Sequence, residues 1–96
     1  MSSHRVANKR PFLVIIHYKS GRVDMGPKTV NATSPGLAAT FGAKHFLIKH
    51  GNNRMDKRRI VIWDKAKGTQ RMYQVNASGN TKYKKSFKVD AHGHVQ

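Results

Sequence analysis

The sequence contains no cysteine and no glutamate. Without cysteine, the protein cannot form disulfide bonds, thiolate zinc sites or cysteine nucleophiles. The acidic residues are four aspartates, none of them close to another in the sequence: Asp24, Asp56, Asp64 and Asp90. Paired-carboxylate catalysis therefore has no support. No glycine-rich segment matches a nucleotide-binding loop, so we expect a protein that is not an enzyme and that uses no cofactor.

Long apolar segments are also missing. The longest apolar run, Phe12–Ile16, is much shorter than the roughly 20 residues of a membrane-spanning helix. The first residues lack the apolar segment of a signal peptide. We therefore expect a soluble protein with no membrane partner. Its expected location is the cytoplasm, or the host cytoplasm or virion if the protein is viral.

Positive charge dominates the composition. The sequence has 19 lysines and arginines against four acidic residues, which gives a net charge of +15. Few internal ion pairs are possible, whereas ordinary soluble surfaces mix both signs of charge. Such a surface favours an anionic partner. Nucleic acid, DNA or RNA bound with weak sequence specificity, is the first expectation, and an acidic protein is the second.

The chain length fits a single domain. Residues 1–10 are polar and basic, and we predict a flexible arm there. Residues 11–90 are expected to form one α+β domain, and residues 91–96 a loose tail. No internal repeat or low-complexity segment divides the chain, and no motif identifies a known family.

The first half of the domain begins with strand signals. Pro11–Lys19 is rich in β-branched and aromatic residues and predicts a central strand buried on both faces. Ser20–Gly21 predicts a turn, after which Arg22–Met25 returns as a second strand. Gly26–Pro27 is expected to end that strand. The following residues, Lys28–Thr33, fit either a strand or a loop.

A helix is expected next. Ser34–Pro35 is typical of a helix start, and Gly51 of a helix end. The residues that recur at helical spacing predict its buried face: Leu37, Ala38, Phe41, His45 and Ile48. Gly42 lies in the middle, where glycine costs about 1 kcal/mol relative to alanine.

Arg58–Val75 predicts two strands joined by a three-residue loop, Ala66–Gly68, with Gly68 in the left-handed conformation. This loop would place Lys65 opposite Thr69. Because side chains alternate along a strand, one face would carry Ile60, Ile62 and Met72. The other face would carry Arg59, Val61, Trp63, Arg71, Tyr73 and Val75.

The last predicted strand is Thr81–Val89. One of its faces would carry Tyr83, Phe87 and Val89, and the other Lys82, Lys84, Ser86 and Lys88. The expected architecture is α+β: a curved antiparallel sheet of about five strands, in the order strand, strand, helix and three strands, with one helix packed on it. A small all-β barrel is the alternative.

The basic and aromatic face of the hairpin is the candidate nucleic-acid site. Trp63 and Tyr73 offer flat rings for base stacking, at roughly 1–3 kcal/mol each. Arg59 and Arg71 could each place a guanidinium on phosphate oxygens. With the surrounding basic residues, the predicted site is Arg54, Lys57, Arg58, Arg59, Trp63, Lys65, Lys67, Arg71, Tyr73, Lys82 and Lys84.

Two other functions fit parts of the sequence. A phage-type interaction protein, either an inhibitor or a virion component, could dock the same basic face on an acidic protein. A metal-independent ribonuclease could use the side chains of His17, Lys44, His45 and Tyr73. His92 and His94 could share one strand face, but no third ligand is fixed, so we predict no metal site.

Overall fold

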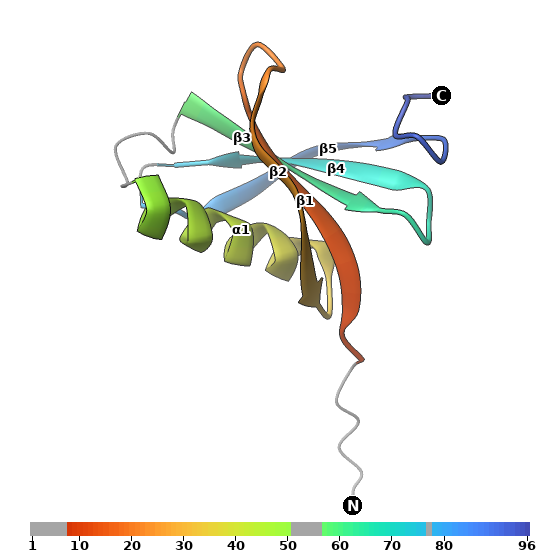
Figure 1. The fold of residues 1–96 in the computed structure, drawn as a ribbon, viewed down its shortest axis with the longest axis horizontal. Helices are drawn as coiled ribbons and strands as arrows, with labels where there is room; N and C mark the ends of the chain where they lie inside the picture. The colour runs from red at the N-terminus through yellow and green to blue at the C-terminus, as the bar shows by residue number, and fades with distance from the viewer. Residues whose placement is uncertain (1–7, 51–56, 77) are drawn as a thin grey trace, which may run out of the picture.

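The computed structural model describes residues 8–50, 57–76 and 78–96, with side chains omitted for 47–50. The elements, drawn in Figure 1, are β1 (Arg10–Tyr18), β2 (Val23–Ala32), α1 (Pro35–His50), β3 (Arg58–Asp64), β4 (Thr69–Val75) and β5 (Thr81–Lys88). The predicted α+β class and element order are confirmed. No helix within these residues is long and apolar enough to cross a bilayer.

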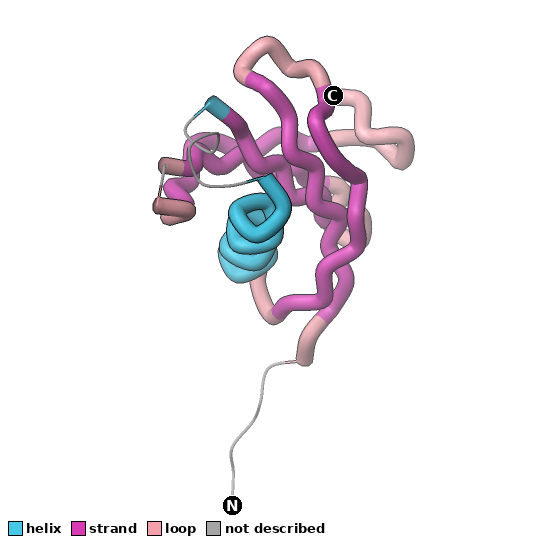
Figure 2. The backbone as a smooth tube through the Cα atoms, turned by 60° about the vertical axis from the view of Figure 1, so that its left-hand side comes forward, coloured by secondary structure: helices cyan, strands magenta, loops and turns pink. Residues whose placement is uncertain are grey.

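The five strands form one antiparallel sheet in the order β2-β1-β3-β4-β5. Because α1 carries the chain from the edge strand β2 across β1, β3 becomes the central strand. β2 and β5 are the two ends of the sheet and do not pair with each other, so the barrel alternative is wrong. The sheet is strongly twisted, and α1 lies on one side of it (Figures 1 and 2). We call that side the helix side and the opposite side the open face.

β1 is buried mainly on the helix side. Phe12, Val14 and Ile16 are buried there, while Leu13 and Ile15 on the open face are half-buried. The expectation of a strand buried on both faces is therefore only partly right. No helix among the described residues covers the open face, which explains the difference.

β2 is longer than expected and continues past Gly26 and Pro27. An edge strand tolerates a proline, since no neighbouring strand needs its missing N–H. Gly26 has a φ of +102°, and a Cβ there would lie 2.5 Å from the carbonyl oxygen of Val14. The pairing of β2 with β1 shifts register in this region. Gly26 and Pro27 therefore lie in a β-bulge, and the strand continues beyond them.

Three alanines and one phenylalanine form the buried face of α1 among the described side chains. The Ser34 hydroxyl accepts a hydrogen bond from the Leu37 amide at 3.2 Å, so the predicted helix start is confirmed. The buried side chains are those of Ala38, Ala39, Ala43 and Phe46. Leu37 and Phe41, which we expected to be buried, are 44% and 43% exposed.

Close approach to the sheet explains this choice of face. A Cβ at Gly42 would lie 2.8 Å from Cγ1 of Val14. Small side chains let the helix backbone come near the branched side chains of β1 and β3. Leu37 and Phe41 would hold the helix further away, so they point outward.

Most of the predicted arm, residues 1–7, lies outside the described residues. Arg10 already belongs to β1, and its guanidinium binds the Asp64 carboxylate at 2.7 Å. The segment 89–96 turns back on itself: Val89 and Val95 form a β-bridge, and the Val89 amide donates to the Gly68 carbonyl at 2.9 Å. Arg10 and the segment 89–96 therefore contribute to the described fold.

Gly42→Ala tests the close approach of α1. Alanine favours a helix by up to about 1 kcal/mol, but overpacking against Val14 costs typically 1–3 kcal/mol, so we expect net destabilisation in urea unfolding. Gly36→Ala is the matched control, since the nearest atoms to a Cβ there are 4.0 Å away. If Gly42→Ala were as stable as Gly36→Ala, the close contact would be wrong.

Candidate nucleic-acid interface

The pairing of β3 with β4 decides which side chains share a face. Asp64 pairs with Thr69, so the loop has four residues, 65–68, and not three. Gly68 has the expected left-handed conformation, with a φ of +65°. The predicted pair of Lys65 with Thr69 is wrong by one residue. A slip of one residue moves every side chain of a strand to the opposite face.

Tyr73 and Arg71 consequently lie on the helix side, away from Trp63 and Arg59. Tyr73 is 5% exposed and belongs to the core that α1 covers. Burial raises the pKa of its phenol, and the nearby Arg71 guanidinium partly opposes that shift. The predicted face that joined Trp63 to Tyr73 does not exist, and Tyr73 is not available for stacking.

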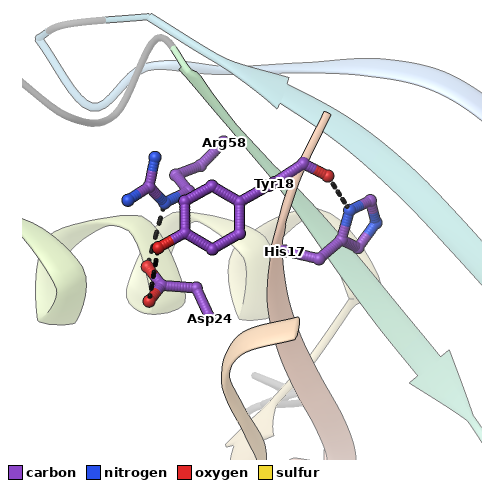
Figure 3. A network of polar contacts seen from close by, with 4 residues as sticks. All are labelled: His17, Tyr18, Asp24 and Arg58. Carbon is purple, nitrogen blue, oxygen red and sulfur yellow. Dashed lines mark hydrogen bonds and ion pairs between the residues drawn. The ribbon is translucent and has the colours of Figure 1, made fainter. Parts of the chain in front are cut away.

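Arg58 is held inside the fold. It is 7% exposed, and its Nε donates to Oδ2 of Asp24 at 2.9 Å. Its guanidinium lies 4.0 Å from the centre of the Tyr18 ring, and the Tyr18 hydroxyl approaches the same carboxylate at 3.5 Å (Figure 3). This network joins β1, β2 and β3. Arg58 therefore already has an anionic partner within the chain.

The open face carries three rows of side chains that run across β1, β3, β4 and β5. Residues paired on neighbouring strands share a face, so the registers define each row. The aromatic row is Leu13, Trp63, Gln70 and Phe87. The middle row is Ile15, Val61, Met72 and Lys85. The donor row is His17, Arg59, Gln74 and Lys82.

A bulge in β5 brings Phe87 to this face. Met72 pairs with Lys85 but Tyr73 pairs with Tyr83, so Lys84 is the extra residue. Tyr83 therefore lies on the helix side and Phe87 on the open face. The prediction that these two rings share a face is wrong. Phe87, Lys85 and Gln74 are among the residues of the open face that the sequence prediction missed.

Basic groups accompany the aromatic rings of the open face. The Lys65 ammonium lies 5.0 Å from the centre of the Trp63 ring, and the Lys85 ammonium 5.1 Å from that of Phe87. One Arg59 nitrogen donates to the Arg58 carbonyl at 3.2 Å, which positions the guanidinium. The two ammonium groups make cation–π contacts with the rings. Proteins that stack bases also place basic groups beside aromatic side chains.

The carboxylates of the described residues are already engaged. Asp24 binds Arg58, Asp64 binds Arg10, and Asp90 faces His94 at 3.5 Å. Among the described residues, the cations of the open face therefore have no acidic partner. Their charge is available to a ligand outside the chain.

The other predicted site residues are spread around the molecule. Lys57, Lys67 and Lys84 are exposed and belong to none of the three rows. Arg71 is exposed on the helix side, where its guanidinium lies 5.7 Å from the centre of the Tyr83 ring. Arg54 lies outside the described residues. The structure thus assembles Arg59, Trp63 and Lys82 on one face, with Lys65 over the indole.

The residues of the ribonuclease hypothesis do not come together. His17 is on the open face, where its Nδ1 is 2.7 Å from the Tyr18 carbonyl. His45 is on α1, on the other side of the sheet, with its Nε2 3.3 Å from the Lys28 ammonium. Tyr73 is buried. In the part of the chain that the structure describes, no three metal-ligating side chains form a cluster.

Asp24→Asn tests the structural role of Arg58. The substitution leaves a buried guanidinium without its carboxylate, so we expect a loss of about 3 kcal/mol in unfolding free energy. Asp90→Asn also removes a carboxylate, but it keeps a side-chain oxygen that can accept from the His92 and His94 amides, so it should cost much less stability. Equal stability of the two variants would show that Arg58 is not held by Asp24.

Tyr73 gives a pH test of the observed register. Its raised pKa means that the folded protein keeps the phenol proton at a pH, above about 10, where the unfolded chain loses it. The stability contributed by this group therefore falls as the pH rises through that range. Ultraviolet titration should contain a late tyrosine step that Tyr73→Phe removes. If the late step persisted in Tyr73→Phe, another tyrosine would be its source, and the raised pKa of Tyr73 would be contradicted.

Comparison with known proteins finds no relative of this chain. The sequence matches no family model, and no curated protein or solved structure is significantly similar to the chain. The geometry and charge of the open face are therefore the features from which we infer a function.

Proposed function

We propose that the protein is a non-enzymatic nucleic-acid-binding protein that uses the open face of its sheet. The observation that supports this most is the arrangement of the three rows. Flat aromatic side chains lie at one end of the open face, and a row of polar and cationic side chains lies at the other end, beyond the middle row. A nucleic acid presents the complementary pair of features, apolar base faces and anionic phosphates.

Electrostatics supports the same ligand. The chain carries a net charge of +15, and the described aspartates are engaged within the fold. Each phosphate that a basic side chain neutralises releases bound counterions, so affinity falls as salt rises. Arg59 and Lys82 are the donor-row residues with permanent charge. We expect each of them to contact one phosphate.

An acidic protein is the second candidate, since the same cations would attract its carboxylates. The carboxylates of an acidic protein, however, would not account for the two aromatic rings of the open face. A pull-down from nuclease-treated lysate separates the two functions, because a nucleic-acid-dependent partner disappears when the nucleic acid is removed. A partner that stays bound after that treatment would favour the protein interface.

Two charge-matched double variants test which face binds. Arg59→Gln with Lys82→Gln removes two charges from the open face, and Lys28→Gln with Lys88→Gln removes two from the helix side. The first pair should flatten the plot of log affinity against log salt by about 1.4–1.8, since each phosphate contributes roughly 0.7–0.9. The second should change this slope far less.

The measurement is a titration of labelled oligonucleotides at several salt concentrations, followed by fluorescence anisotropy. Equal losses in the two double variants would mean that only total charge matters, and would contradict the open face as the site. Absence of any binding at low salt would contradict the proposed function itself.

A further inference from the structure

We infer, building on the proposed function, that the ligand of the open face is a single strand of nucleic acid. Its bases stack on the aromatic row and its phosphates lie along the donor row. The strand therefore crosses β3, β4 and β5 instead of following them. Three features of the open face lead to this inference: its apolar content, the hollows beside Trp63 and the placement of its charges.

The apolar content excludes a duplex as the best ligand. Six side chains of the aromatic and middle rows form a continuous apolar area: Leu13, Ile15, Val61, Trp63, Met72 and Phe87. A duplex keeps its base faces stacked inside and presents phosphates and groove edges. Only an unpaired strand can cover apolar side chains with base faces. Val61, at the centre of this area, is only 7% exposed and offers little surface to a base. The surfaces available for stacking are therefore the aromatic rings at the margins of the area.

Hollows on two sides of Trp63 provide room for bases. One hollow, of about 310 Å³, lies between the indole and the start of β1, where Leu13 and Thr29 contribute to its lining. The other, of about 240 Å³, lies between the indole and residues 89–91. Lys65 lines both hollows. A base placed in either one would lie against the indole and near an ammonium group.

The C-terminal turn fixes the indole between these hollows. A Cβ at Gly93 would lie 3.1 Å from Cη2 of Trp63, so the glycine lets the backbone contact the ring edge. The ring is therefore held in place before a ligand arrives, which lowers the entropic cost of stacking.

Charge placement orients the strand. Asp90 lines the second hollow, and its carboxylate repels phosphate. We therefore expect uncharged bases, and not phosphates, in that hollow. Along β1, β3 and β4 the donor row lies four residues from the aromatic row, about 13 Å away; along β5 the bulge makes the offset five residues, and Lys85 lies between the two rows. A row that crosses β3, β4 and β5 spans about 10 Å, which corresponds to about three stacked nucleotides.

Trp63 is the only tryptophan of the chain, so its fluorescence reports stacking directly. The probes are a labelled oligothymidylate of about twelve nucleotides, within known single-strand site sizes, and the same strand paired with its complement. The single strand should bind more tightly than the duplex and quench Trp63 emission. The duplex should bind with little quenching.

Phe87→Leu tests the second stacking position without the risk of removing Trp63. We expect single-strand affinity to fall about fivefold to a hundredfold, while duplex affinity changes little. Tyr83→Leu is the matched control, because it removes an aromatic ring from the helix side of the same strand. It should leave both affinities unchanged. Thermal unfolding of both variants confirms that they fold.

The outcomes separate the two claims. Equal affinity for the single strand and the duplex, with Trp63 emission unquenched, would overturn the single-strand inference and leave the proposed function in place. An equal effect of Phe87→Leu and Tyr83→Leu on single-strand affinity would overturn it as well. Binding of neither probe at low salt would overturn the proposed function.

Discussion

The buried carboxylate of Asp64 constrains the rest of the structure. It is 3% exposed and binds Arg10 at 2.7 Å, so the residue must face the helix side. Its backbone and side-chain oxygens also accept hydrogen bonds from the Lys67 amide, which stabilises the turn to β4. Because Asp64 pairs with Thr69, these contacts together set which face each β3 and β4 side chain occupies. A buried carboxylate without its cation would cost several kcal/mol, so the Arg10 ion pair keeps Asp64 on the helix side.

The two sides of the sheet carry different kinds of residues. The helix side holds the apolar core, the buried Tyr73 and the ion pairs of Asp24 and Asp64. Because those carboxylates are taken up there, the open face keeps cations without internal partners beside rings that no helix covers among the described residues. This separation is the basis for the ligand that we propose, one that bears phosphates and has exposed base faces.

The sequence predicts the element order, the helix start at Ser34 and the left-handed Gly68, because local rules for caps and turns determine these features. It does not predict the pairing that follows the turn, since loops of three and four residues both fit the same glycine. The bulge at Lys84 and the close approach at Gly42 depend on contacts between distant segments. The candidate site changed for this reason: Trp63, Arg59 and Lys82 remain together, whereas Tyr73, Arg71 and Phe87 exchange sides.

The register of the β3–β4 hairpin is therefore the quantity to measure. Cross-strand nuclear Overhauser contacts between backbone protons report it directly in solution. The account predicts contacts that join Trp63 to Gln70 and Val61 to Met72 as directly opposite pairs. Contacts that instead join Trp63 to Arg71 and Val61 to Tyr73 as opposite pairs would contradict it, because they would return Tyr73 to the face of the indole.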